Sequence, residues 1–216
     1  MLLVVRHGQA AGNRSHRFIG QSDVDLDDEG REQARLVSER LARAGVARIV
    51  SSDLRRCLDT VAPLAESTGV AIEPEPRLRE VANGEWTGRL PEEIAAGWPE
   101  LWRRYRSGED VPRPGGERWA DVRSRVTGTL VELAEDEAVI VVATHGGPAL
   151  LAVEWATGVR LPGNVFRGAL GAIANASVTT IDPGAPRLIG FNDVGHLGRT
   201  ITAAEVPYAA VREPEN

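Results

Sequence analysis

The stretch Leu2-Leu3-Val4-Val5-Arg6-His7-Gly8 joins a short apolar run to an arginine, a histidine and a glycine. Four apolar residues, two of them β-branched, predict a short strand that is buried on both faces. In an open α/β sheet, ligands bind at the carboxyl ends of the strands. Arg6 and His7 stand at such an end, and Gly8 lets the backbone approach a ligand closely. This stretch therefore predicts both a buried strand and a candidate site.

Two further apolar runs end in the same way. Residues 138–143 lead into Thr144-His145-Gly146-Gly147, and residues 47–50 lead into Ser51-Ser52-Asp53-Leu54-Arg55-Arg56. If the three strands are parallel neighbours, their ends bring two histidines and several arginines to one edge of the sheet. This arrangement predicts a single site that is assembled from three distant parts of the chain.

Strand and helix patterns alternate along the rest of the chain, which predicts a layered α/β sandwich. Helices are expected from Asp27 or Asp28 to about Ala44, and over about 53–68, 117–135 and 148–157. Further strands are expected at 71–75, 169–181 and 187–192.

The segment from Arg79 to about Gly116 has a different composition, with three tryptophans, a tyrosine and several prolines. We interpret residues 81–116 as a partly helical, lid-like excursion within a single domain that spans residues 1–216. Its aromatic residues can pack as a small subcore, shape a substrate pocket, or do both.

Composition excludes several classes of protein. The chain has 216 residues, of which 42% are hydrophobic, and this suits one domain with a sizeable core. The net charge of -6 gives no basic surface for nucleic acid. Cys57 is the only cysteine and lies on the apolar stripe of a predicted helix, so no internal disulfide is expected. With no signal peptide and no apolar run of membrane-spanning length, we expect a cytoplasmic protein without membrane contact, either monomeric or a homodimer.

A metal ion and a phosphate group are the two ligands to weigh for histidines and arginines at one edge. Neither His7 nor His145 has a second metal ligand at the usual spacing, and arginines would repel a cation, so no metal is expected. A phosphate fits better, because guanidinium groups bind its oxygens in pairs. Backbone N–H groups at the starts of helices after Gly8 and Gly146 would add donors.

Histidine in such a pocket can also act as a nucleophile toward the phosphorus atom. A neutral imidazole nitrogen can form a phosphohistidine if an acceptor holds the other ring nitrogen. A second, protonated histidine would then stabilise the oxygens of the transferring group. A carboxylate must act as acid for the leaving alcohol and as base for water, and spacing alone does not choose between Glu80 and Glu85.

Six motifs in this order resemble the histidine phosphatase superfamily, also called phosphoglycerate mutase-like. They are Arg6-His7-Gly8, Asn13 with the loop Arg17-Phe18-Ile19-Gly20 through Asp25-Leu26, Ser52-Asp53-Leu54-Arg55-Arg56, Leu78-Arg79-Glu80 with Gly84, Trp86 and Gly88, Gly115-Gly116-Glu117, and Thr144-His145-Gly146-Gly147. The resemblance covers most of residues 1–200. It implies a three-layer α/β/α sandwich with a mostly parallel central sheet.

The resemblance also implies a role for each site residue. His7 would be the phosphorylated nucleophile, and Arg6, Arg56 and His145 would form the phosphate pocket. Glu80 would be the acid and base. Three further residues would help to bind phosphate or substrate: Asn13, Gly20 and Gly146. No metal and no organic cofactor is implied.

Departures from the family pattern favour a phosphatase over a cofactor-dependent phosphoglycerate mutase. Gln9 stands where many family members have glutamate, and Thr87 stands where glutamate is common. Ile19 and Asn83 differ from the residues that mutases carry, and the segment between Gly88 and Gly115 is shorter than in mutases. Three arginines there, Arg103, Arg104 and Arg106, fit an exposed helix face better than a substrate site. A non-catalytic phospholigand-binding module is the second alternative, although such a module has no need for Glu80.

The predicted activity is therefore hydrolysis of a small phosphorylated metabolite, of the sugar phosphate or phosphoglycerate type. The stretch from Gly171 to Ser177 is similar to actinobacterial family members that act on phosphorylated sugars or glycerates.

Overall fold

The computed structural model describes residues 1–10 and 17–198 of the chain, so Asn13 lies outside the described residues. The strands are β1 (Leu2–Arg6), β2 (Val46–Ser51), β3 (Ile72–Pro74), β4 (Val139–Thr144), β5 (Val178–Asp182) and β6 (Arg187–Asp193). The α-helices are α1 (Asp28–Leu41), α2 (Arg55–Thr68), α3 (Pro91–Gly97), α4 (Pro99–Arg106), α5 (Trp119–Ala134) and α6 (Gly146–Thr157). The described residues also form the short 3-10 helices η2 (Pro76–Leu78), η3 (Gly84–Trp86), η4 (Val165–Arg167) and η5 (Gly195–Leu197).

The six strands form one sheet in the order β3-β2-β4-β1-β5-β6. The first four strands of this order are parallel, and β5 and β6 continue the sheet in antiparallel fashion. The predicted mostly parallel sheet is confirmed. Because β1, β4 and β2 are parallel neighbours, Arg6, Thr144 and Ser51 end their strands at the same edge.

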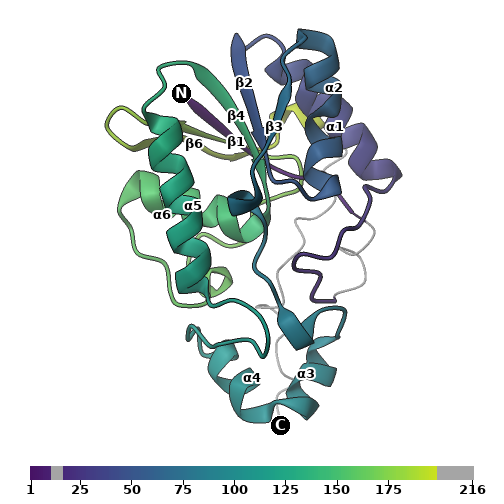
Figure 1. The fold of residues 1–216 in the computed structure, drawn as a ribbon, viewed down its shortest axis with the longest axis vertical. Coiled ribbons are helices and arrows are strands. Elements are labelled where there is room, and N and C mark those ends of the chain that lie inside the picture. Colours follow the sequence, from purple (N-terminus) through teal and green to yellow (C-terminus); the bar gives the residue numbers. More distant parts are fainter. Residues whose placement is uncertain (11–16, 199–216) are drawn as a thin grey trace.

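Helices cover both faces of the sheet, with α1 and α2 on one side and α5 and α6 on the other (Figure 1). Successive side chains of β1 point to opposite faces of the sheet, so this strand contributes to the core on both faces. Leu2 and Val4 join the cluster that contains α5 and α6, whereas Leu3 and Val5 join the cluster that contains α1 and α2. The predicted three-layer sandwich is confirmed.

The excursion carries a third, smaller core below the sheet, where α3 and α4 lie in Figure 1. Trp86, Ile94, Tyr105 and Val111 are buried there. Phe18, from the loop after β1, packs edge-on against Trp86, with ring centroids 5.9 Å apart. The aromatic residues therefore do form a packed subcore, and it ties the excursion to the loop that follows the first strand.

One expectation about local structure is wrong. The strand expected at 169–181 begins only at Val178, because residues 172–175 are irregular and bind to the end of β1 through tertiary hydrogen bonds. The helix expected from Asp27 or Asp28 does begin at Asp28, and the Gly8 N–H donates to the Thr60 hydroxyl.

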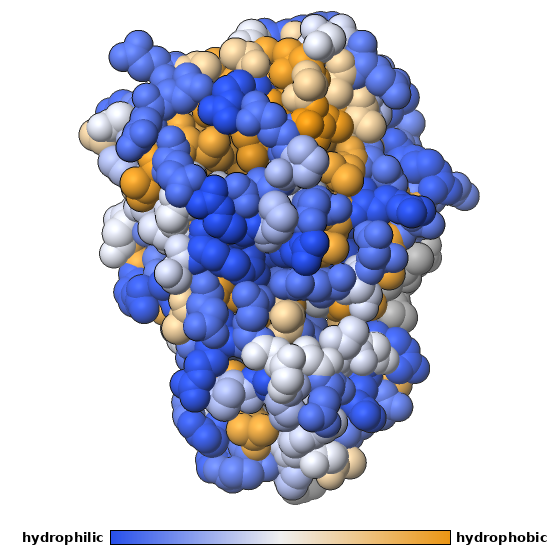
Figure 2. All heavy atoms as spheres, viewed as in Figure 1, coloured by the Kyte–Doolittle hydropathy of each residue, from blue (hydrophilic) through white to orange (hydrophobic). Residues whose placement is uncertain are grey.

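The surface in Figure 2 is mostly hydrophilic around the excursion, and apolar residues gather over the strands between α5 and α2. Within residues 1–10 and 17–198, no helix is both long and apolar enough to cross a bilayer.

Candidate active site

Arg6 and His7 are held at the end of β1 by a segment from the far end of the chain. The Arg6 guanidinium donates to the carbonyl oxygen of Ile173, and the Asn175 amide donates to the carbonyl oxygen of His7 over 2.9 Å. The His7 N–H donates to the carbonyl oxygen of Thr144 over 2.9 Å. The first histidine is thus fixed by its main chain from two sides.

The His7 ring has a defined orientation. Its Nδ1 atom lies 2.7 Å from the carbonyl oxygen of Gly8. Because a carbonyl oxygen only accepts, Nδ1 carries the proton and Nε2 keeps a free lone pair. Burial lowers the pKa of His7 well below its ordinary value, and the charges of Arg56 and Arg6 lower it further. The imidazole is therefore neutral, as a nucleophile requires.

His145 lies directly beside it. The two imidazole rings are 5.2 Å apart between centroids and meet edge to face. The Nε2 atom of His145 lies 2.8 Å from the Ser52 hydroxyl and 3.4 Å from the Cys57 sulfur, and all three side chains are fully buried. Burial, followed by the charge of Arg56, lowers the pKa of His145 well below its ordinary value. A bound phosphate dianion would act in the opposite direction and favour the protonated ring.

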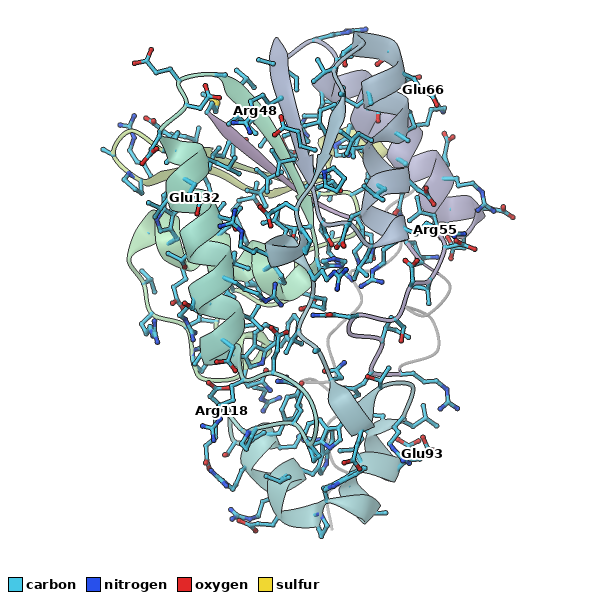
Figure 3. All side chains as sticks on the ribbon, viewed as in Figure 1. Arg48, Arg55, Glu66, Glu93, Arg118 and Glu132 are labelled. Atoms are coloured by element: carbon cyan, nitrogen blue, oxygen red, sulfur yellow. The ribbon has the colours of Figure 1, made fainter. Side chains whose placement is uncertain are left out.

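Arg56, and not its neighbour Arg55, points into this cluster. Arg56 is 2% exposed, and its guanidinium donates to the carbonyl oxygens of Gly20 at 2.8 Å and Ser22 at 2.7 Å. The Arg55 side chain, labelled in Figure 3, is 60% exposed and pairs with Asp25 at the surface. The loop after β1 therefore orients the buried guanidinium of Arg56 through two of its carbonyl oxygens.

Glu80 reaches the same edge from the start of the excursion. Its carboxylate accepts from the Val81 N–H at 2.9 Å and from the Gly147 N–H at 3.1 Å, which lies in the first turn of α6. Glu85, the alternative acid, is exposed on the surface of the excursion. The structure therefore brings Glu80, and not Glu85, against the turn that follows His145.

The predicted substrate-binding glycines have different positions. Gly20 adopts a φ of +53°, and a Cβ there would lie 2.9 Å from the Val81 carbonyl oxygen, so a larger residue does not fit. Its carbonyl oxygen holds Arg56. Gly146 opens α6 directly after His145, which supplies the helix N-cap. The predicted N–H donors at the start of this helix thus lie beside the two histidines.

Several residues around the site gave no clear signal in the sequence. Ser52 stood inside a motif, but nothing indicated its contact with His145. Arg113 is 2% exposed, and its guanidinium lies 5.3 Å from the Trp119 ring centroid and 5.5 Å from that of Tyr105. It donates to the Glu117 carbonyl oxygen at 3.1 Å.

A metal ion would find little to bind in this arrangement. In the described parts of the chain, no three or more histidine, cysteine, aspartate or glutamate side chains gather with the geometry of a metal site. The cluster offers two uncharged imidazoles, two buried guanidinium groups and one carboxylate. These groups can surround a tetrahedral anion, attack it and exchange a proton with it.

The chain resembles known proteins over nearly its whole length. The model of the family described as "Histidine phosphatase superfamily (branch 1)" matches residues 2–194. Among curated relatives, a glucosyl-3-phosphoglycerate phosphatase of Mycolicibacterium vanbaalenii is 36% identical over 201 residues, which is 85% of this chain and 88% of the relative. The phosphoserine phosphatase 1 of Hydrogenobacter thermophilus is 35% identical over 150 residues, covering 68% of this chain and 71% of the relative.

A solved structure shares the fold. A mycobacterial glucosyl-3-phosphoglycerate phosphatase in complex with VO3 superimposes with a TM-score of 0.76 at 33% identity, covering 88% of this chain and 98% of that one.

Proposed function

The chain belongs to the histidine phosphatase superfamily, and on that premise we propose that it hydrolyses a small phosphorylated metabolite through phospho-His7, without a metal. Hydrolase activity on phosphomonoesters is the activity of the named relatives. The observation that carries the proposal for this chain is the meeting of His7 and His145, with ring centroids 5.2 Å apart, between Arg6 and Arg56.

The reaction would proceed in two steps. The lone pair of His7 Nε2 attacks phosphorus, the bond from phosphorus to the ester oxygen breaks, and Glu80 gives its proton to the leaving alcohol. Glu80 then accepts a proton from water, the water oxygen attacks phosphorus, and the phosphorus–nitrogen bond breaks to release inorganic phosphate. Arg6, Arg56 and His145 stabilise the charge on the transferring oxygens in both steps.

The relatives suggest a substrate class. The proteins named glucosyl-3-phosphoglycerate phosphatase cover 83% of this chain or more, and the phosphoserine phosphatase 1 of Hydrogenobacter thermophilus covers 68%. We therefore propose a phosphorylated glycerate or sugar derivative as substrate. Asn13, Gly20 and Gly146 are proposed to bind the phosphate or its neighbouring groups, and the excursion at 81–116 is proposed to enclose the rest of the molecule.

Two rival functions are separated by experiment. A phosphoglycerate mutase would exchange phosphate between the 2- and 3-positions of phosphoglycerate faster than it releases phosphate to water. A phospholigand-binding module would bind phosphate without hydrolysing any substrate. The phosphatase names of the relatives favour hydrolysis, and the placement of Glu80 against α6 favours catalysis over binding.

The test is phosphate release across a panel of phosphorylated sugars, glycerates, serine phosphate and nucleotides. The wild-type chain should hydrolyse members of the first three groups, EDTA should leave the rates unchanged, and His7→Ala should abolish turnover while preserving the fold. Activity that survives His7→Ala would end the proposal.

We propose in addition that residues 1–216 act as one domain and that the protein works in the cytoplasm. Light scattering of the purified chain distinguishes a monomer from the homodimer that the sequence allows.

A further inference from the structure

Arg125 lies on α5, between Arg118 and Glu132, which Figure 3 labels. Its guanidinium donates to three main-chain carbonyl oxygens: those of Arg77 at 2.7 Å, Arg79 at 2.6 Å and Glu80 at 3.0 Å. These carbonyls belong to the segment where the chain leaves the sheet edge and enters the excursion. One side chain thus provides hydrogen bonds to three carbonyl groups of this segment.

The same guanidinium is held by a carboxylate. The Arg125 Nε atom lies 2.9 Å from Glu117 Oε1, and a second nitrogen lies 3.0 Å from Oε2. Glu117 Oε2 also accepts from the Ala82 N–H at 2.8 Å. The main chain is therefore held on both sides of Glu80. Arg125 donates to carbonyl oxygens before and at Glu80, and Glu117 accepts from the Ala82 N–H after it.

Gln21 extends this network to the phosphate pocket. Its amide nitrogen donates to the Glu80 carbonyl oxygen at 2.9 Å and to Glu117 Oε2 at 3.3 Å. Gln21 stands between Gly20 and Ser22, whose carbonyl oxygens hold the guanidinium of Arg56. The side-chain amide of Gln21 thus connects the loop that orients Arg56 with the segment that carries Glu80.

These contacts leave Glu80 little freedom. Hydrogen bonds fix the main chain of Glu80 at its carbonyl oxygen and at the next-but-one residue, Ala82. The Glu80 carboxylate in turn accepts from the Val81 and Gly147 N–H groups. A misplacement of about 1 Å in a reacting group can cost about a hundredfold in rate. The Arg125 side chain is 17% exposed, so the network is largely shielded from competing water.

We infer that Arg125, with Glu117 and Gln21, is a positioning residue for proton transfer: it touches no substrate and sets where the Glu80 carboxylate meets the leaving oxygen. The inference rests on the proposed function, in which Glu80 is the acid. A planar guanidinium fork is required, because a lysine ammonium cannot reach three carbonyls and a carboxylate together.

The test uses leaving groups of different basicity. An alkyl phosphomonoester such as glycerol 3-phosphate needs a proton on its leaving oxygen, whereas p-nitrophenyl phosphate departs with little help. In a two-step mechanism kcat/KM reports only the transfer to His7. Arg125→Lys should lower kcat/KM for the alkyl ester by about tenfold to a hundredfold and for the aryl ester by less than about threefold. Lysine keeps the positive charge near His145, so any difference between Arg125→Lys and the wild-type chain reports the loss of the guanidinium hydrogen bonds.

Two further variants separate positioning from damage to the fold. Gln21→Leu removes the hydrogen bonds of this amide to the Glu80 carbonyl oxygen and to Glu117 but leaves those of Arg125 in place, so it should shift the alkyl-to-aryl ratio in the same direction by a smaller factor. Arg123→Lys is the matched control, because Arg123 is a similarly buried arginine on α5 that pairs with Glu154 instead. It should leave the ratio at its wild-type value.

A double-mutant cycle with Glu80→Gln completes the test. If Arg125 acts through Glu80, Arg125→Lys should change the alkyl-to-aryl ratio no further in the Glu80→Gln background. An equal loss on both esters, or an independent loss in that background, would overturn the inference. If Glu80→Gln itself affects both esters equally, the assigned role of Glu80 is wrong, which is a failure of the proposed function and not of the network alone.

Discussion

The Nδ1 atom of His7 lies 2.7 Å from the carbonyl oxygen of Gly8, the residue that follows it. This contact determines which ring nitrogen is available. Since Nδ1 keeps its proton and donates it in a hydrogen bond to this carbonyl oxygen, the lone pair that can attack phosphorus belongs to Nε2. The geometry of the site therefore leads to a specific chemical intermediate.

The phosphoryl group is expected on Nε2 of His7. With p-nitrophenyl phosphate, whose leaving group needs little protonation, Glu80→Gln should still form the intermediate but hydrolyse it slowly, because the proposed base for water is missing, so the intermediate should accumulate. Quenching in alkali, where phosphohistidine persists, followed by phosphorus–proton NMR correlation on the labelled peptide, identifies the nitrogen. Phosphate on Nδ1, or on His145, would contradict the assigned tautomer.

Stability should decline in mild acid because of the two histidines. In the unfolded chain they protonate near their ordinary pKa of about 6.5, whereas burial and the arginines hold the pKa values of His7 and His145 well below this in the folded chain. Below about pH 6.5 the unfolded state binds more protons, so the free energy of unfolding falls as the pH drops toward the folded pKa values.

Urea unfolding at pH 7.5, 6.5 and 5.5 measures this slope. The double variant His7→Gln with His145→Gln should show a smaller decrease between pH 6.5 and 5.5 than the wild-type chain does. Burial also lowers the pKa of His196, but this residue is present in both proteins, so its contribution to the slope is the same in each. Equal slopes in the two proteins would show that the histidines are not held in the neutral form.

Ser52 should affect phosphate binding through His145. Ser52→Ala removes the hydroxyl that lies 2.8 Å from Nε2 and leaves a buried ring nitrogen without this partner. A loss of about tenfold in kcat/KM, and a similar loss in affinity for inorganic phosphate, is expected. Ser51→Ala is the control, because this equally buried hydroxyl donates to the main-chain carbonyl oxygen of Ser52 at 2.8 Å. It should leave phosphate affinity unchanged.

Adjacent glycines at the start of α6 should respond differently to alanine. A Cβ at Gly147 would lie 2.3 Å from the Trp119 ring and 2.7 Å from the Glu80 carboxylate, whereas a Cβ at Gly146 meets nothing closer than 3.6 Å. Gly147→Ala should cost about 1–3 kcal/mol through overpacking. Gly146→Ala should preserve the melting temperature, since alanine is the better helix former. Thermal unfolding of both variants provides the comparison, and equal melting temperatures would contradict it.

The sequence was sufficient to predict which residues meet at one edge of the sheet. Buried strands read as continuous apolar runs, so the ends at Arg6, Ser51 and Thr144 were recognisable without coordinates. The family resemblance was needed to prefer Arg56 over Arg55 and Glu80 over Glu85, because both choices depend on which side chain faces inward.

Contacts between distant segments were beyond what the sequence could predict. Residues 172–175 alternate small and apolar side chains as a strand does, yet their polar atoms bind Arg6 and the His7 carbonyl. The three carbonyls that Arg125 holds lie more than forty positions away in the chain. Periodicity describes one element at a time, so hydrogen bonds that join elements leave no pattern in it.

The place of β1 in the sheet has a consequence for biosynthesis. This strand lies between β4 and β5, and both follow it by more than a hundred residues in the chain. A growing polypeptide therefore exposes this apolar strand, together with the proposed nucleophile His7, long before either neighbour has left the ribosome. Completion of the sheet and maturation of the enzyme must coincide, and the nascent chain needs shielding from aggregation until then.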